Sequence, residues 1–216
     1  MPDLFIITGS NGAGKSSVGP TYLPDYIKKS YTVFDGDKLF MQRQRELWKQ
    51  GLRAHKEAKK LAFSFVVETF DNLVENAIRT NDSFAYEGHF TNDATWDIPK
   101  RFKEHGYSVH LLFLGLDSPD LSELRVIDRS KEGGHYVDHL TIRDNFYGNL
   151  EKLDKYFALI DHLKIIDTSS TIHLLLVQVD HGTIAHILPF SKLPPWFSDN
   201  LKHLTDWILT QGYTKI

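Results

Sequence analysis

The chain has 216 residues, which is enough for one α/β domain with a sizeable core. Apolar residues make up 41% and charged residues 25%, values typical of a globular protein, and a formal net charge of -3 gives no sign of a nucleic-acid surface. The absence of cysteine excludes disulfides, thiol catalysis and thiolate metal ligands, and it fits a reducing compartment.

The first 24 residues predict a strand, a glycine-rich turn and a helix. Residues 4–8 are a short apolar run that ends at Gly9, which is typical of a buried strand. A helix is expected to begin at Lys15 and to be stopped by Pro20 and Pro24, since proline cannot continue a helix. A strand that runs through glycines into a helix is an arrangement suited to binding an anion.

Strand and helix patterns alternate along the next part of the chain. Apolar runs predict strands at residues 31–34, 83–86, 109–114 and 164–166. Helical patterns occupy residues 54–79, 96–105 and 118–155, the last interrupted at Gly133 and Gly134. This alternation implies a mostly parallel sheet with helices on both faces, whose binding crevice lies at the carboxyl ends of the strands.

The pattern changes near the carboxyl terminus. From residue 172, two apolar runs flank Asp180, His181 and Gly182, which indicates a β-hairpin. A short helix is expected over residues 201–209. The expected organisation is one domain over residues 1–216, with a core at 1–170 and a hairpin with a terminal helix at 171–216.

Residues 9–16, GSNGAGKS, match the phosphate-loop pattern G-x-x-x-x-G-K-[ST] between a strand and a helix. Glycines let successive N–H groups converge on phosphate oxygens, and the helix amino terminus would add its positive end. Lys15 would reach the terminal phosphates and Ser16 would bind Mg²⁺. We expect a nucleoside triphosphate to be bound by Asn11, Gly12, Ala13, Gly14, Lys15, Ser16, Ser17 and Arg125.

Acidic residues follow two of the predicted strands. Asp35 and Asp37 leave the end of the second strand and would face the same crevice as the phosphate loop. Either could hold the water shell of the metal, and one could accept a proton from an attacking hydroxyl. Glu87 ends the third strand, where an acid would lie near the Mg²⁺ waters. The alternatives are an Asp-Gly-Asp turn that satisfies its own backbone and a capping or loop role for Glu87.

Arginines mark the helical segment over residues 118–146 as a candidate lid. Arg125 and Arg129 are four residues apart and therefore share one helix face, and Arg143 follows later. Such a set could close over the phosphates of a nucleotide. A solvated helix face is the alternative for each of these side chains.

Four segments resemble the zeta toxin-like family of small P-loop kinases: GSNGAGKSS, VFDGDKLF, AYEGHFT and LSELRVIDRSKEGGHYVDHLTIRDNF. The bacterial branch of that family has a helix with paired arginines, a Gly-Gly-His-x-Val turn and a second basic helix. The resemblance covers roughly residues 4–170 of the chain. It implies a three-layer P-loop NTPase fold with a helical arginine lid, and phosphorylation of a hydroxyl by ATP.

The resemblance also implies roles for particular residues. Asp37 would be the general base, Lys15 and Arg129 would stabilise the transferring phosphoryl group, and Ser16 would bind Mg²⁺. The toxins carry a second arginine near the position of Gly134. That charge would come here from Arg143, Arg125 or a protonated His135, or be missing, and we place Arg143 with the catalytic residues.

The best-known members of the family phosphorylate a UDP-activated N-acetyl amino sugar, and an antitoxin-like protein is a possible partner. Glu68 lies near the position of a substrate-contacting glutamate of the toxins, although a solvated helix stripe is the alternative. We expect the acceptor to be contacted by Asp35, Glu68, Glu87 and His135.

The leading hypothesis is a kinase that transfers the γ-phosphoryl group of ATP to a hydroxyl of a small molecule, possibly such an amino sugar. The alternative is a nucleotide-dependent regulatory ATPase or binding module that acts through a partner protein. A polynucleotide kinase would want a basic groove, so no nucleic acid is expected. The amino terminus lacks a basic region and a long apolar run, so neither a signal peptide nor a membrane span is expected, and the cytoplasm is the predicted location.

Overall fold

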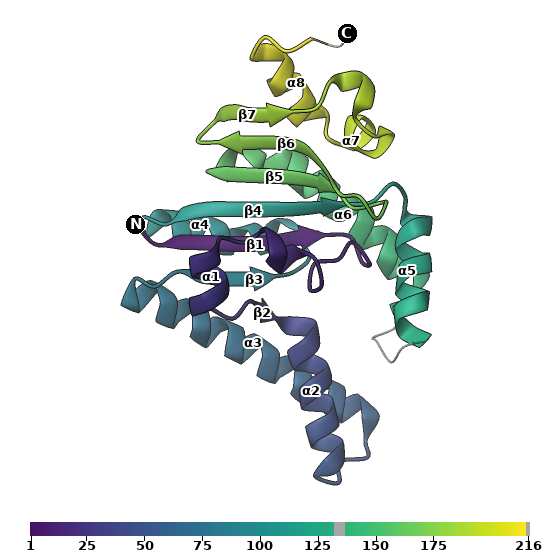
Figure 1. Ribbon diagram of the computed structural model, residues 1–216. Helices are drawn as coiled ribbons and strands as arrows, with labels where there is room; N and C mark the ends of the chain where they lie inside the picture. Colours follow the sequence, from purple (N-terminus) through teal and green to yellow (C-terminus); the bar gives the residue numbers. More distant parts are fainter. Residues whose placement is uncertain (132–136, 215–216) are drawn as a thin grey trace.

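The computed structural model describes residues 1–131 and 137–214, which form a seven-stranded sheet (Figure 1). The strands are β1 Asp3–Gly9, β2 Phe34–Asp35, β3 Phe84–Glu87, β4 Ser108–Gly115, β5 His162–Asp167, β6 Leu174–Asp180 and β7 Thr183–Ile187. They lie in the order β2-β3-β1-β4-β5-β6-β7; the first five are parallel, and β6 and β7 are antiparallel to their neighbours. This confirms the α/β class and the mostly parallel sheet.

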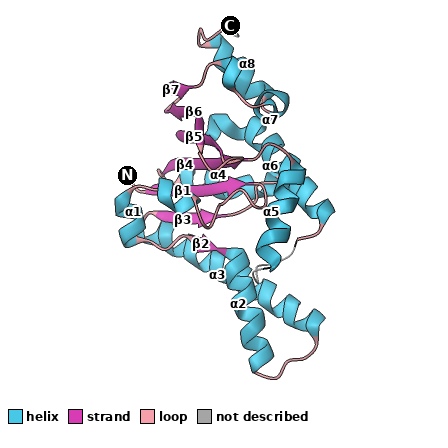
Figure 2. Cartoon of the chain, turned by 45° about the vertical axis from the view of Figure 1, so that its right-hand side comes forward, coloured by secondary structure: helices cyan, strands magenta, loops and turns pink. Residues whose placement is uncertain are grey.

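Helices cover both faces of the sheet, with α1 on one face and α4 and α6 on the other (Figures 1 and 2). Their bounds are α1 Asp25–Ser30, α2 Gly36–Lys49, α3 His55–Thr80, α4 Asp97–Glu104, α5 Pro119–Lys131, α6 His139–Tyr156, α7 Pro195–Asn200 and α8 Lys202–Thr210. The predicted break at Gly133 and Gly134 lies outside the described residues. Within the described ranges, no helix combines the length and apolar character that a bilayer span requires.

The two central strands carry the core. Leu4 and Ile6 of β1 and Val109 and Leu114 of β4 are at most 1% exposed, as expected for parallel strands buried on both faces. The parallel register places Ile7 opposite Glu87, and Glu87 opposite the last residue of β2. The chain therefore leaves β1, β2 and β3 at the same edge of the sheet.

The prediction that a helix begins at Lys15 is wrong. The chain instead makes a turn in which the amide of Gly19 donates to the carbonyl of Gly14 at 2.9 Å, and then a short 3₁₀ helix that ends at Tyr22. Pro20 explains the difference, because an α-helix from Lys15 would meet a residue without an N–H, whose ring clashes with the carbonyl four residues earlier. The phosphate loop is thus not followed by a regular helix.

The second predicted strand is also shorter than expected, and a helix that we did not predict follows it. Only Phe34 and Asp35 pair with β3, because the chain then enters α2. Asp35 caps this helix: its Oδ1 accepts a hydrogen bond from the amide of Lys38 at 2.9 Å. An aspartate at this position satisfies an amide that the first turn leaves unpaired.

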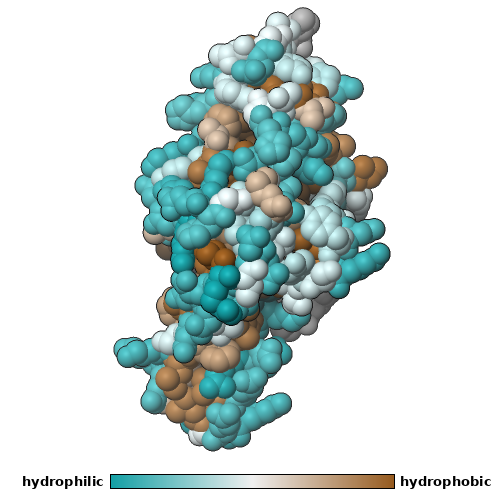
Figure 3. Space-filling model, turned by 90° about the vertical axis from the view of Figure 1, so that its left-hand side faces the viewer, coloured by the Kyte–Doolittle hydropathy of each residue, from teal (hydrophilic) through white to brown (hydrophobic). Residues whose placement is uncertain are grey.

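Helices α2 and α3 pack together and project from the edge of the sheet as an arm (Figures 1 and 2). Leu47, Ala58 and Ala62 form its small core. Trp48 is 53% exposed and Phe63 63% exposed, and Figure 3 shows apolar atoms gathered at the lower end of the molecule, which the arm forms. Apolar surface of this kind is typical of a site covered by another molecule.

The predicted hairpin is present as β6 and β7, and it continues the sheet beyond β5. Its turn contains His181 and Gly182, both with positive φ, as a tight hairpin turn requires. Trp196 and Phe197 of α7 are buried. Asp154 of α6 joins α8 to this core: its Oδ1 accepts from the amide of Leu204 at 2.9 Å and its Oδ2 from that of His203 at 3.0 Å.

Replacing Asp154 by alanine is expected to destabilise the protein by about 1 to 3 kcal/mol, because buried amides of the first turn of α8 would lose their acceptor. Chemical denaturation measures the change. Asp206→Ala, at an exposed position of the same helix, is the control and should change the unfolding free energy by less than about 0.5 kcal/mol. Equal losses in both variants would show that Asp154 does not cap α8.

Candidate active site

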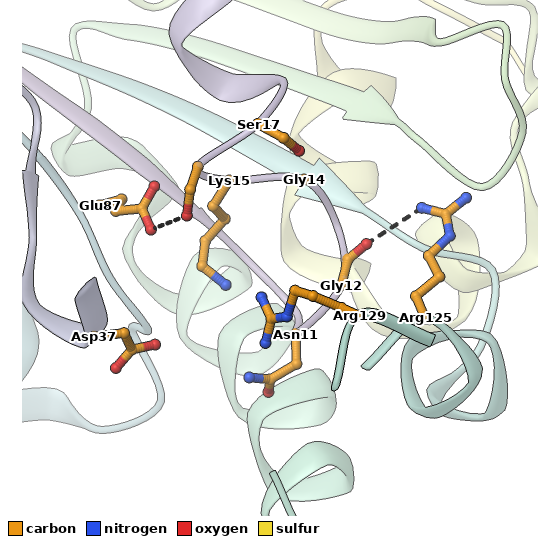
Figure 4. A pocket seen from close by; sticks show the side chains of 10 residues that line it. Asn11, Gly12, Gly14, Lys15, Ser17, Asp37, Glu87, Arg125 and Arg129 are labelled. Carbon is orange, nitrogen blue, oxygen red and sulfur yellow. Dashed lines mark hydrogen bonds between the residues drawn. The ribbon is translucent and has the colours of Figure 1, made fainter. Parts of the chain in front are cut away.

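A pocket of about 210 Å³ lies at the carboxyl edge of the parallel strands (Figure 4). One wall is the phosphate loop, from Asn11 to Ser17. Asp37, at the start of α2, and Glu87, at the end of β3, form the opposite side, while Arg125 and Arg129 enter from α5. The structure thus brings together most of the side chains that the sequence singled out.

The carbonyl groups of the phosphate loop are held by side chains of other elements. The carbonyls of residues 11, 12 and 13 accept hydrogen bonds from Ser122, Arg125 and Thr168 at 2.5, 3.3 and 3.0 Å. Two of these donors lie on α5 and one directly after β5. Because side chains of other elements saturate the carbonyls, the loop is fixed with its carbonyl side facing the protein.

The amide groups of the same loop are left available. In the part of the chain that the structure describes, the amides of Gly12, Gly14, Lys15 and Ser16 donate to no protein acceptor. Gly12 and Gly14 have φ of 72° and 91°, a conformation that glycine adopts without strain. Successive free amides around a concave turn bind oxyanions, so the loop fits a phosphate group.

Lys15 provides a cation at the centre of this loop. Its Nζ donates to the carbonyls of Gly9 and Ser10, both at 3.1 Å, and lies 3.3 Å from Nε2 of His89. Burial lowers the pKa of Lys15 to about 8, and the nearby carboxylate of Glu87 opposes that shift. A bound polyphosphate would favour the charged form, which is the electrostatic match that a nucleotide pocket needs.

Ser16 and Glu87 face each other across the pocket. The hydroxyl of Ser16 donates to Oε1 of Glu87 at 2.6 Å. The pKa of Glu87 is raised to about 7, chiefly by burial and in part by the neighbouring Asp35, whereas the bond from Ser16 opposes the shift. A hydroxyl and a carboxylate are oxygen ligands of the kind that Mg²⁺ prefers together with phosphate and water. These two side chains therefore fit a magnesium ion.

The two arginines of α5 have different surroundings. Nη2 of Arg125 donates to the carbonyls of Thr168 and Ser169, both at 2.8 Å, in addition to its bond to Gly12. Arg125 thus ties the phosphate loop to the segment after β5, whereas Arg129, one turn later, projects into the pocket near Lys15 (Figure 4).

Four of the expected site residues do not line the pocket: Ala13, Asp35, Glu68 and Arg143. Asp35 caps α2 and does not line it. Glu68 lies on the outer side of α3, in a hollow next to Phe63. Arg143 is exposed, with its guanidinium 5.9 Å from the ring centroid of Tyr147, and His135 lies outside the described residues. The roles predicted for these residues therefore stay predictions.

The sequence analysis missed a polar network that supports the loop from behind. Nδ1 of His89 lies 3.1 Å from Nδ2 of Asn149, and Asn145 donates from Nδ2 to Oδ1 of Asn11 at 2.8 Å. Burial keeps the pKa of His89 well below its ordinary value. The signal for His89 was present in AYEGHFT, where it follows Glu87 by two residues, but Asn145 and Asn149 stand in a helical pattern that carries no such mark.

The fold and the site define the class of P-loop nucleotide-binding proteins of the kinase type: a parallel sheet, a phosphate loop after β1, and an acid after the adjacent β3. The chain matches the family model described as Zeta toxin over residues 1–179. It belongs to the zeta toxin family.

Individual proteins are also similar to the chain. An uncharacterized protein of Haemophilus influenzae is 26% identical over 129 residues, which cover 60% of this chain and 81% of the relative. The structure of the PezAT toxin–antitoxin system of Streptococcus pneumoniae aligns with a TM-score of 0.60 at 19% identity, over 80% of this chain and 71% of that one. The AvrRxo1-ORF1:-ORF2 complex with ATP gives 0.64 at 16% identity, over 86% and 60%. At these identities the two structures show a shared fold.

The raised pKa of Glu87 predicts a pH dependence of stability in metal-free buffer. Glu87 holds its proton up to about pH 7 in the folded protein but releases it near 4.5 when unfolded. Because the folded state binds more protons in this window, the unfolding free energy should fall as the pH rises from about 4.5 to about 7, by at most about 3 kcal/mol.

Denaturant titrations at several pH values measure this fall, and Glu87→Gln should remove it. Lys15 acts in a separate window. Its lowered pKa makes stability rise between about pH 8 and 10.5, because there the unfolded chain binds the extra proton. A slope below pH 7 that persists unchanged in Glu87→Gln would contradict the assignment.

Proposed function

We propose that the protein is an ATP-dependent kinase that transfers the γ-phosphoryl group to a hydroxyl of a small molecule. The observation that carries the proposal is the single pocket in which free loop amides and Lys15 face Asp37 and Glu87. The cations and free amides suit the nucleotide that donates the phosphoryl group. The exposed carboxylate of Asp37 on the opposite wall suits the molecule that accepts it. ATP binding is supported by the similarity in fold to the AvrRxo1-ORF1:-ORF2 complex with ATP.

In this proposal Asp37 takes up the proton of the acceptor. It lies in the first turn of α2, is exposed, and lines the pocket. In the proposed reaction an acceptor oxygen forms a bond to the γ-phosphorus while the bond to the bridging oxygen breaks, and ADP leaves with that electron pair. The acceptor proton passes to the carboxylate of Asp37. Lys15 and Arg129 neutralise charge on the phosphoryl oxygens.

Magnesium would be held by the hydroxyl of Ser16 and, directly or through water, by Glu87. When bound, the ion would offset the negative charge of the phosphate oxygens. Oε1 of Glu87 lies 2.6 Å from the hydroxyl oxygen of Ser16. The carboxylate that we expected to contact the acceptor is therefore also near the proposed metal position.

An antitoxin-like protein partner stays a prediction for this chain. PezAT is a toxin–antitoxin system, and AvrRxo1-ORF1 occurs in complex with ORF2. The exposed Trp48 and Phe63 on the arm of α2 and α3 offer apolar surface of the kind that partners cover. Neither observation identifies such a partner.

Asp37→Asn is expected to lower kcat for phosphoryl transfer by about 100-fold to 10,000-fold, because the amide cannot take up the acceptor proton. Affinity for ATP with Mg²⁺ should be kept, since the phosphate loop is unchanged. Mass spectrometry of products from a metabolite extract with ATP identifies acceptors, and calorimetry gives the nucleotide affinity.

Asp35→Asn is the matched control, two residues away. It replaces a helix cap by another good cap, so it should change stability by less than about 1 kcal/mol and lower turnover far less than Asp37→Asn does. Full activity of Asp37→Asn would refute the base assignment. ATP hydrolysis without any phosphorylated product would instead support the alternative of a regulatory ATPase.

A further inference from the structure

A second cavity of about 250 Å³ adjoins the nucleotide pocket. Its walls come from β2, β3, α3, α4 and the loop after β3, and its apolar lining consists of Phe34, Val66, Phe70, Tyr86, Phe90 and Ile98. Glu87 lines both cavities. The two cavities therefore meet at the carboxylate that faces Ser16.

The apolar wall is built from rings that support one another. The ring centroids of Phe34 and Phe70 are 5.1 Å apart, those of Phe70 and Tyr86 5.2 Å, and those of Tyr86 and Phe90 6.0 Å. Tyr86 and Phe90 are buried in the main core. Such contacts fix the ring orientations, so the cavity offers a preformed surface to a flat apolar group.

The charges around the two cavities differ. Among the described residues that line the second cavity, Glu87 is the only one with a charged side chain. His89 also lines it. Lys15, Arg125 and Arg129 all belong to the first pocket. A diphosphate in the second cavity would meet no cationic side chain among the described lining residues, which is costly in a partly buried site.

The position of the cavity fits that of an acceptor site. Gly36 lines it, and the next residue, Asp37, lines the nucleotide pocket. The proposed proton acceptor thus lies between the two spaces. A molecule in the second cavity could turn a hydroxyl towards Asp37 and the γ-phosphate.

We propose, on the basis of the kinase function above, that the acceptor is an uncharged small molecule that carries a hydroxyl and an aromatic or alicyclic ring, with the ring in this cavity. The apolar, ring-lined surface suits such a group, whereas the diphosphate of a nucleotide sugar would find no cationic side chain among the described residues that line the cavity.

Two substitutions change the cavity without touching the catalytic groups. A Cβ on Gly88 would meet no atom within 4 Å, and its φ lies outside the left-handed region, so Gly88→Leu fills the cavity without backbone strain. Val67 lines the cavity and is 42% exposed, so Val67→Lys places a cation there. Ser64→Leu, on α3 but outside the cavity, is the control.

The probes are benzyl alcohol, phenylethanol and indanol, compared with UDP-N-acetylglucosamine. Each is incubated with ATP and Mg²⁺ for product analysis, and its binding to the protein with a non-hydrolysable ATP analogue is followed by NMR. We expect the uncharged alcohols to bind and be phosphorylated. Gly88→Leu should raise their KM by about tenfold or more, with ATP affinity and the thermal midpoint unchanged as proof of folding. Val67→Lys should also weaken binding of the uncharged alcohols, and Ser64→Leu should not.

The outcomes separate this inference from the kinase function. The inference would be overturned if the protein phosphorylated UDP-N-acetylglucosamine, with a KM that falls in Val67→Lys, and did not bind the alcohols. The proposed kinase function would then still stand. The kinase function would be overturned if ATP were hydrolysed but no acceptor gave a phosphorylated product. If the alcohols still bound and Gly88→Leu abolished that binding, the cavity would remain a ligand site. Alcohol binding that Gly88→Leu leaves unchanged would overturn the assignment of this cavity.

Discussion

The arrangement of the site depends on how the carbonyl groups of the phosphate loop are satisfied. Ser122 and Arg125 from α5 and Thr168 after β5 take up the carbonyls of residues 11–13. A glycine-rich turn has many backbone conformations, and these contacts select the one whose amides face the pocket. Nucleotide binding therefore relies on the docking of α5 and β5 against the loop as much as on the loop sequence. The helix dipole that usually assists such a loop has little part here, because no regular helix follows it.

The two cavities divide the proposed reaction by polarity. One contains the cations, free amides and acids that a triphosphate and its metal require, and the other contains aromatic rings. Glu87 and the first turn of α2 lie between them, so the reacting atoms would meet where a polar surface borders an apolar one. Exclusion of water by the apolar side would strengthen the charge interactions on the polar side and limit loss of the phosphoryl group to solvent.

Much of this could be predicted from the sequence, for physical reasons. Leu4 and Ile6 belong to a continuous apolar run, which a parallel sheet requires, and the spacing of Gly9, Lys15 and Ser16 is specific to one kind of turn. The prediction of a helix at Lys15 was wrong because Pro20 follows Lys15 too closely for two helical turns to form. Residues such as Asn145 and Thr168 could not be assigned, because their partners in the phosphate loop are 134 and 155 residues away along the chain. The apolar acceptor cavity was equally hidden, since its rings come from four separate elements.

The arm of α2 and α3 has a mechanical consequence. Helix α2 carries Asp37 in its first turn and the exposed Trp48 near its other end, and α3 contributes Val66 and Phe70 to the wall of the second cavity. Both helices are continuous and packed against each other, so a molecule that bound the tip of the arm would move them together as one rigid unit. Tilting it would displace the proton acceptor and the acceptor pocket in one motion, while the phosphate loop, anchored through α5 and β5, stayed in place.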